Sequence, residues 1–121
     1  LATPDGDGRT MDDLHDVTWV MEPRGTAARD WAETLCRYAG FEPDVRYETT
    51  DLRLHVDLVR RGHCVALLPD LAHEPRDTGI SLRSLPGDPQ RIIRTNVRSG
   101  SRDHPGLAAC QHALTWAAET L

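Results

Sequence analysis

Residues 51–69 carry the clearest apolar pattern in the chain, and it predicts a helix followed by a buried strand. The helical part has apolar residues on two nearly opposite sides, Leu52, Val56 and Val59 on one and Leu54 and Leu58 on the other. A helix with two apolar sides is expected to pack on both of them. Gly62 is a residue type that ends helices, and residues 64–68 are apolar without interruption before Pro69. Such a run is typical of a strand that is buried on both faces.

The segment before it predicts a second helix between two strands. Residues 26–39 place Ala27, Trp31, Leu35 and Tyr38 on one stripe, which we expect to face the core with Trp31 inside it. Thr26 is a suitable N-cap and Gly40 a suitable stop. Strands are predicted over residues 17–21, which include Trp19, and over residues 44–48. Strands that alternate with helices indicate an α/β fold, with residues 44–48 and 64–68 as the two strands of a βαβ unit.

The remaining segments give weaker patterns. Residues 1–10 have the composition of a flexible loop, and Thr10 can cap a single helical turn at residues 11–14. Another turn is predicted at 70–73, a loop at 74–79, and strands at 80–85 and 91–98. A last helix is expected over residues 106–121 after a loop at 99–105. Its stripe consists of Leu107, Cys110, Leu114, Ala117 and Leu121, with Trp116 on the opposite side.

Composition restricts the classes of protein that fit. With 121 residues, 27% charged and 39% apolar, the chain is expected to be one small globular domain or part of one. Its net charge of −5, from 14 basic and 19 acidic residues, argues against DNA binding by this chain alone. No apolar run is long enough for a membrane span. Because the chain opens with Leu1 in a polar stretch, we expect it to be a piece of a longer protein.

The cysteines and histidines do not form a recognisable site. Cys36, Cys64 and Cys110 are far apart and odd in number, which predicts reduced, partly buried thiols in a cytoplasmic protein. His63 and Cys64 are adjacent in a predicted strand and would point to opposite faces, and His104, Cys110 and His112 lack a zinc-binding spacing. Neither a nucleophile elbow nor a Gly-rich nucleotide loop occurs. The sequence therefore predicts no metal, no cofactor and no catalytic residue.

Two strand-to-helix turns are the candidate binding segments. Arg24, Gly25 and Thr26 open the first helix, where free N–H groups, a close backbone approach, a hydroxyl and a cation could bind a carboxylate or phosphate. Thr49 and Thr50 form the second turn, and ligands of open α/β sheets bind at the carboxyl ends of strands. An ordinary turn and ordinary helix caps explain the same residues without any ligand.

Several fragments, in their order, resemble one known family. Asp13-Leu14 precedes the strand with Trp19, and Arg24-Gly25-Thr26 opens the helix that Cys36, Ala39-Gly40-Phe41 and Pro43 close. Leu58-Val59, Gly62 and Val65-Ala66-Leu67-Leu68-Pro69 follow, then Arg91-Ile92-Ile93-Arg94, and Pro105 before the last helix. Over nearly the whole chain this resembles the second half of the effector-binding domain of LysR-type transcriptional regulators.

The resemblance implies a fold and a function. The fold would be one lobe of a type II periplasmic-binding-protein-like α/β domain, with a mixed, mostly parallel sheet flanked by helices. Residues 1–98 would form the second lobe, and residues 99–121 a hinge loop and a helix that returns to an absent first lobe. The chain would sense a small, anionic effector in the cleft between lobes and control the oligomer state of the DNA-bound regulator, while a separate domain binds DNA.

Two further expectations accompany this interpretation. The alternative to a regulator is a lobe of a free-standing solute-binding protein or of an enzyme on the same fold. If the last helix lacks its lobe, its apolar stripe needs another partner, and we expect it to fold back or to pair with a second copy in a homo-oligomer.

Overall fold

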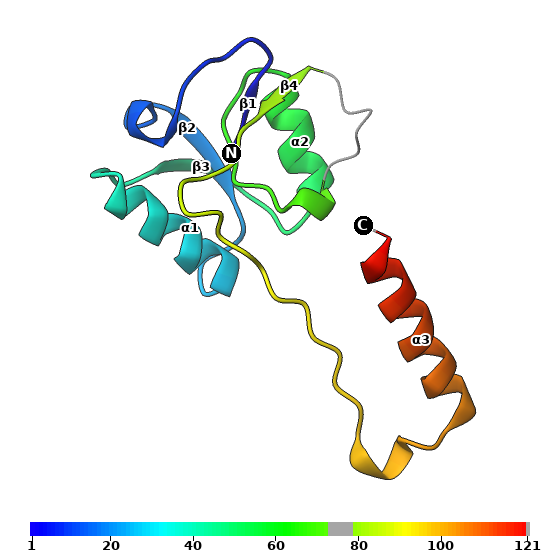
Figure 1. The fold of residues 1–121 in the computed structure, drawn as a ribbon. Helices are drawn as coiled ribbons and strands as arrows, with labels where there is room; N and C mark the ends of the chain where they lie inside the picture. Colours follow the sequence, from blue (N-terminus) through cyan, green and yellow to red (C-terminus); the bar gives the residue numbers. More distant parts are fainter. Residues whose placement is uncertain (73–78, 121) are drawn as a thin grey trace. The chain divides into compact units, whose positions relative to one another are not determined.

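The computed structural model describes residues 1–72 and 79–120, which form two compact units, Leu1–Pro89 and Gln90–Leu121. We describe each unit by itself (Figure 1). His73, the last residue of one predicted turn, and most of the predicted loop 74–79 lie outside the described residues. The assignment of residues 1–98 to one lobe and 99–121 to another stays a prediction.

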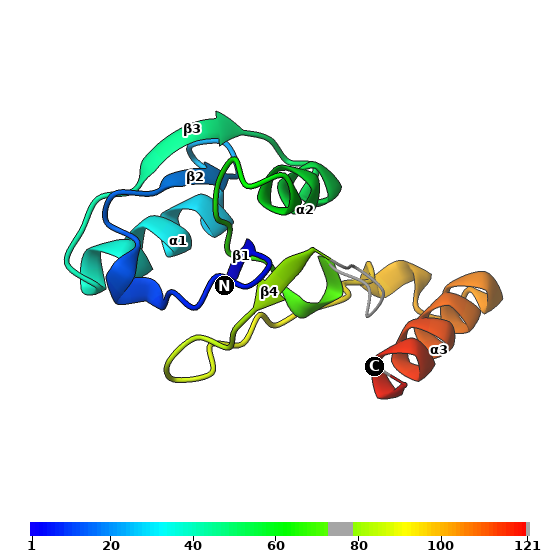
Figure 2. The same ribbon diagram turned by 90° about the horizontal axis from the view of Figure 1, so that it is seen from above.

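A mixed sheet forms the centre of the first unit. Strand β2 (Thr18–Met21) pairs in parallel with β3 (Asp44–Glu48), and β1 (Ala2–Pro4) pairs antiparallel with β4 (Ile80–Leu82). Residues 65 and 66 join the two pairs, because Val65 bridges to Trp19 in parallel and Ala66 bridges to Ala2 antiparallel. The resulting order is β3, β2, the segment at 65–66, β1 and β4, as Figure 2 shows from above. The α/β class predicted from the sequence is confirmed.

The predicted strand at 64–68 is shorter than expected. Its first three residues are buried, as predicted, but only Val65 and Ala66 pair with neighbours. Val65 exchanges hydrogen bonds with β2, its N–H donating to the Thr18 carbonyl at 2.9 Å and its carbonyl accepting from the Val20 N–H at 3.1 Å. It therefore lies next to β2 rather than next to β3, so the two strands of the predicted βαβ unit flank a third strand.

The expectation of a flexible loop over residues 1–10 was wrong at its beginning. Ala2–Pro4 form β1, and Leu1, Ala2 and Thr3 are buried. Ala2 exchanges backbone hydrogen bonds of 2.8 and 3.0 Å with Ala66. The turn-forming residues that suggested a loop begin only at Pro4, and the few apolar residues before them become central because partners lie on both sides. The predicted turn at 11–14 is present as Met11–Asp13.

The two faces of the sheet carry two separate core clusters. Side chains alternate along β2, so Trp19 and Met21 face one side and Val20 the other. Trp19 and Met21 pack with Val65 and with residues of helix α1 (Ala27–Tyr38), while Val20 packs with Ala66 and with Val59 of helix α2 (Leu52–Arg60). Each helix therefore covers its own face. Because α1 follows β2, α2 follows β3 and these strands are parallel, both helices begin at the carboxyl edge of the pair.

Helix α1 turns a different face to the core from the one predicted. Its buried residues are Arg29, Ala32 and Cys36, whereas Trp31 is 43% exposed and Tyr38 is 85% exposed. The small side chains of Ala32 and Cys36 let the helix approach the sheet closely, which the larger side chains of the predicted stripe would prevent. Leu35 belongs to the predicted stripe and also contacts the core, since it packs partly buried against the cluster.

Helix α2 confirms one of its two predicted stripes. Val56 and Val59 are buried, and Asp51 caps the helix by accepting from the N–H groups of Arg53 and Leu54 at 2.9 and 3.3 Å. On the other side Leu58 packs against the core, but Leu54 is 43% exposed. The expected packing on both sides is therefore wrong for Leu54. Gly62 ends this region with a φ of 75°, a left-handed conformation that favours glycine.

In the second unit the helix is confirmed and the strand is not. Residues 91–98 form neither a helix nor a strand that pairs with any described segment, and Ile92 and Ile93 are more than two-thirds exposed. A strand needs a neighbour to bind its backbone groups, and this unit offers none. Helix α3 (Pro105–Glu119) begins with proline in its first turn, and His104 caps it by accepting from the Gly106 N–H at 3.1 Å. None of its described residues is buried.

Candidate functional site

The two predicted binding segments lie side by side at the carboxyl edge of the parallel strands. Met21, the last residue of β2, is in register with Glu48, the last residue of β3. Beyond that pair, the Thr49 N–H donates to the Met21 carbonyl at 3.1 Å and extends the pairing by one bond. The turn at 22–26 and the turn at 49–51 therefore begin from adjacent positions, a pairing of strands that the sequence analysis did not specify.

The first turn offers backbone donors and one exposed cation. Gly25 has a φ of 86°, and a side chain added there would meet nothing within 4 Å, so the turn is open on that side. Ala27 and Ala28 lie in the first turn of α1, where N–H groups have no acceptor within the helix. Arg24 is exposed and makes no ion pair with the part of the chain that the structure describes.

The Thr26 hydroxyl is less available than the sequence suggested. It donates to the Pro23 carbonyl at 2.9 Å and accepts from the Arg29 N–H at 3.2 Å. Its single proton is thus already bound within the turn, so it cannot donate to an anion without breaking that bond. Thr26 acts as the N-cap of α1 and shapes the turn that presents the neighbouring N–H groups.

In the second turn the hydroxyl protons remain available. Thr49 accepts from the Asp51 N–H at 3.1 Å through its hydroxyl oxygen, which leaves its proton without an acceptor among residues 1–72 and 79–120. Thr50 is exposed, and its hydroxyl has no partner in the same described ranges. Because Asp51 caps the helix, neither threonine is needed as the cap. Both can donate to a ligand.

Arg29 is the residue at this edge that sequence reasoning missed. Only 2% of it is exposed, and its guanidinium binds three oxygens around it. Nε donates to Glu33 Oε1 at 2.6 Å, and Nη1 donates to the Glu22 carbonyl and to Glu48 Oε2, both at 3.1 Å. An arginine in a helical pattern is expected to be solvated, so nothing in the apolar periodicity pointed to it.

His55 was missed for the same reason. It is 2% exposed on α2, and its Nε2 lies 2.9 Å from the Thr49 carbonyl. A carbonyl only accepts, so Nε2 carries the proton in this contact. His55 therefore holds the second turn from the side of α2, while its Nδ1 is buried without a partner among the described residues.

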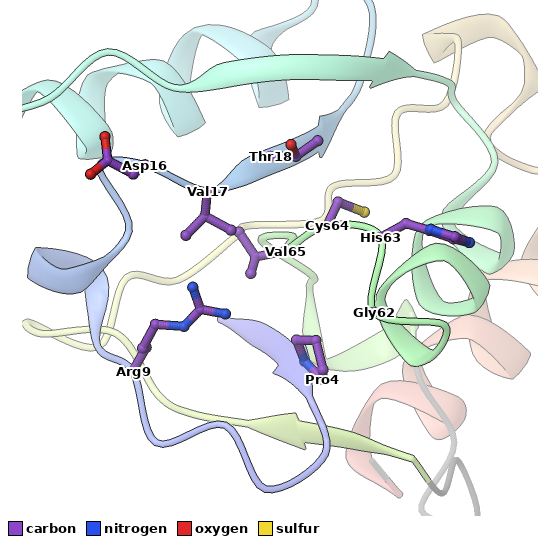
Figure 3. A pocket seen from close by; sticks show the side chains of 9 residues that line it. All are labelled: Pro4, Arg9, Asp16, Val17, Thr18, Gly62, His63, Cys64 and Val65. Atoms are coloured by element: carbon purple, nitrogen blue, oxygen red, sulfur yellow. The ribbon is translucent and has the colours of Figure 1, made fainter.

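A hollow of about 220 Å³ lies at the opposite, amino edge of the same strands. Figure 3 shows its lining side chains, which come from the end of β1, from Arg9 in the connection after it, from residues 16–18 at the start of β2 and from residues 62–65. Its cation, Arg9, is already bound by the carboxylate of Asp7, and this bond holds the pKa of Asp7 below its usual value. None of the five predicted binding residues lines this hollow.

The cysteines are free but differ in environment. Cys36 and Cys64 are buried, as predicted, whereas Cys110 is exposed and not partly buried. Burial raises the pKa of both buried thiols to about 11, with the carboxylates of Glu42 and Glu33 adding to the effect at Cys36. Across the described residues no group of three His, Cys, Asp or Glu side chains could hold a metal ion, and no helix could span a membrane.

Comparison with known proteins gives a consistent family. The family model described as the LysR substrate binding domain matches residues 1–119. The DNA-binding transcriptional dual regulator OxyR of Escherichia coli K12 is 33% identical over 94 residues, which cover 75% of this chain and 31% of the relative. The uncharacterized HTH-type transcriptional regulator YcgK of Bacillus subtilis is 24% identical over 83 residues, covering 69% of this chain and 26% of the relative. The chain thus spans about a quarter to a third of the length of these curated relatives. No solved structure matches the chain.

Proposed function

The chain belongs to the LysR substrate-binding domain family, and on that premise we propose that it is the effector-sensing part of a LysR-type transcriptional regulator. In this proposal a small anionic effector binds at the carboxyl edge of β2 and β3, and the bound state alters how copies of the regulator associate on DNA. DNA binding belongs to another part of the protein. The relatives named above are transcription regulators, which favours this proposal over a solute-binding protein or an enzyme lobe.

The observation that supports the proposed site best is the arrangement of donors at one edge. Arg24 contributes a cation, Ala27 and Ala28 contribute N–H groups at the positive end of a helix, and Thr49 and Thr50 contribute hydroxyl protons. These groups all donate, which suits a carboxylate or phosphate better than a cation or an apolar ligand. In a two-lobed domain this edge would face the cleft, with the other lobe closing over the ligand.

A cysteine-based response to oxidants fits the chain less well. One relative, from Escherichia coli O6:H1, is named as a hydrogen peroxide-inducible genes activator and is 33% identical over 94 residues. A thiol that reacts with peroxide must be accessible and largely ionised. Cys36 and Cys64 are buried, and their pKa values of about 11 keep them protonated at neutral pH. Cys110 is exposed, but it belongs to helix α3 in the second unit and is not part of the two turns of the proposed site. We therefore propose reversible binding of an effector, with no chemical step and no cofactor.

The site can be tested with simple anions. Inorganic phosphate and succinate serve as probes, with glycerol as the neutral comparison, and binding is measured by isothermal titration calorimetry. Thr49→Val removes the free hydroxyl at nearly constant volume, and Thr49→Ser keeps it. Loss of a hydrogen bond to a charged ligand is worth about 1.5–3 kcal/mol, so Thr49→Val should weaken anion binding by about tenfold or more.

The matched variant decides how the result is interpreted. Thr49→Ser should bind the anions about as well as the unchanged chain. Arg24→Gln should weaken anion binding, and the loss should be larger at low salt than at high salt. Equal affinities in Thr49→Val and Thr49→Ser, or heat of binding with glycerol equal to that with the anions, would remove this edge as the site.

A further inference from the structure

Two of the three buried polar residues in the described chain stand at the proposed effector edge. Arg29 and His55 are both 2% exposed, and the third, Thr3, belongs to β1 away from this edge. Burying a cation is unfavourable unless its charge and its donors are matched. The acceptors that bind the Arg29 guanidinium therefore indicate which parts of the chain this residue connects.

One of the three bonds of Arg29 is local and two are not. Glu33 lies one turn further along the same helix, and its bond of 2.6 Å would be enough to neutralise the guanidinium. The Glu22 carbonyl belongs to the turn that follows β2, and Glu48 is the last residue of β3, 19 residues away in sequence. Through Nη1 alone, Arg29 joins the start of the first binding turn to the start of the second.

We propose that Arg29 is a positioning residue that fixes the turn at 22–26 against the end of β3, so that both turns present their donors to one ligand. This inference rests on the proposed function. His55 supports the same arrangement from α2 through its bond to the Thr49 carbonyl, and the Thr49 N–H is bound to Met21. The two turns are thus held at their backbones, while the donors of Arg24, Thr49 and Thr50 stay exposed or half-exposed.

The charges around Arg29 allow a test in which two explanations predict opposite signs. Glu33 and Glu48 both pair with Arg29, and Glu33 also lies 3.9 Å from Nη1 of the half-exposed Arg37. Removing either carboxylate charge should, by Coulomb's law alone, strengthen the binding of an anion nearby. If Glu48 matters because it completes the connection through Arg29, its neutralisation should weaken anion binding instead.

The experiment compares Glu48→Gln with Glu33→Gln in the same chain. Each variant removes one charged acceptor from Arg29 and leaves the other, so the buried guanidinium stays paired and the fold is preserved. Affinity for inorganic phosphate and amide hydrogen exchange are measured on both. Glu48→Gln should weaken phosphate binding about fivefold and speed exchange of the Thr26 and Thr49 amides, whereas Glu33→Gln should keep the affinity within about twofold.

A double variant separates positioning from direct contact of Glu48 with the ligand. If Glu48 acts through Arg29, adding Arg29→Lys to Glu48→Gln should weaken binding little more than either change alone. Additive losses, or stronger phosphate binding in Glu48→Gln, would overturn the inference. If phosphate does not bind the unchanged chain, the proposed site is wrong. The connection through Arg29 is then still tested by hydrogen exchange: amides of Thr26 and Thr49 that exchange as slowly in Glu48→Gln as in the unchanged chain would refute it.

Discussion

The buried cysteines give a prediction whose size follows from the structure. Burial raises the pKa of the Cys36 and Cys64 thiols from 9.0 to about 11. Each pKa unit changes the thiolate fraction tenfold below both values, so at pH 8 the two residues have about a hundredfold less thiolate than an ordinary cysteine. Since the thiolate is the reactive form, alkylation should be slower. The higher nucleophilicity of a high-pKa thiolate offsets part of this factor, and occlusion by the core should slow alkylation further.

The assay is iodoacetamide labelling of the folded chain, with the modified residue identified by mass spectrometry. Cys110, which is exposed, should be labelled first, and Cys36 and Cys64 should follow only when the chain opens. In urea all three should react at similar rates, which controls for local sequence effects. Labelling of Cys36 or Cys64 within tenfold of Cys110 in the folded chain would refute the account of the buried thiols.

The raised pKa values of Cys36 and Cys64 should also make the free energy of unfolding depend on pH in the alkaline range. Between about pH 9 and about pH 11 the unfolded chain has released thiol protons that the folded chain still holds, so stability should fall as pH rises through this range. A two-unit shift corresponds to roughly 2–3 kcal/mol per buried thiol over the whole range, and about half of this should be lost between pH 8 and pH 10. Urea unfolding at pH 8 and pH 10 measures the change, and Cys64→Ala should reduce it by about half.

Two further predictions concern association. The chain alone should not bind DNA, because its net charge is −5, and sequence-specific binding at sub-micromolar concentration in a gel shift would contradict this. The chain should self-associate through helix α3, whose apolar residues include the exposed Leu114 and Trp116. Sedimentation of the unchanged chain and of Leu114→Glu should show association lost in the variant, and a monomer in both cases at high concentration would contradict the idea.

Capping residues and strand patterns in the sequence predicted most of the first unit. Thr26 occupies the cap position predicted for it, and Gly40 and Gly62 end their helices with left-handed backbone. The site segments could be placed because parallel strands bring their carboxyl ends to one edge. Each of these signals depends on a few neighbouring residues, so it can be recognised in a single sequence without knowledge of the fold.

Errors arose where packing depends on a distant partner. The stripe of Trp31 and Tyr38 counted large apolar residues, but the face that packs is the one whose small residues allow close approach to the sheet. Residues 91–98 have strand-like composition without a neighbouring strand in their unit, and β1 has little composition signal but two neighbours. Arg29 was missed because its acceptors, Glu22 and Glu48, are brought together only by the fold.

The most direct test of the proposed binding edge is a titration of the chain with inorganic phosphate, followed by backbone amide NMR. The account predicts the largest shifts at Gly25, Ala27 and Ala28 and at Thr49 and Thr50, where the donors of the two turns converge. Shifts confined to Arg9, His63 and Cys64 would place the anion in the hollow at the opposite edge of the sheet and contradict the central claim.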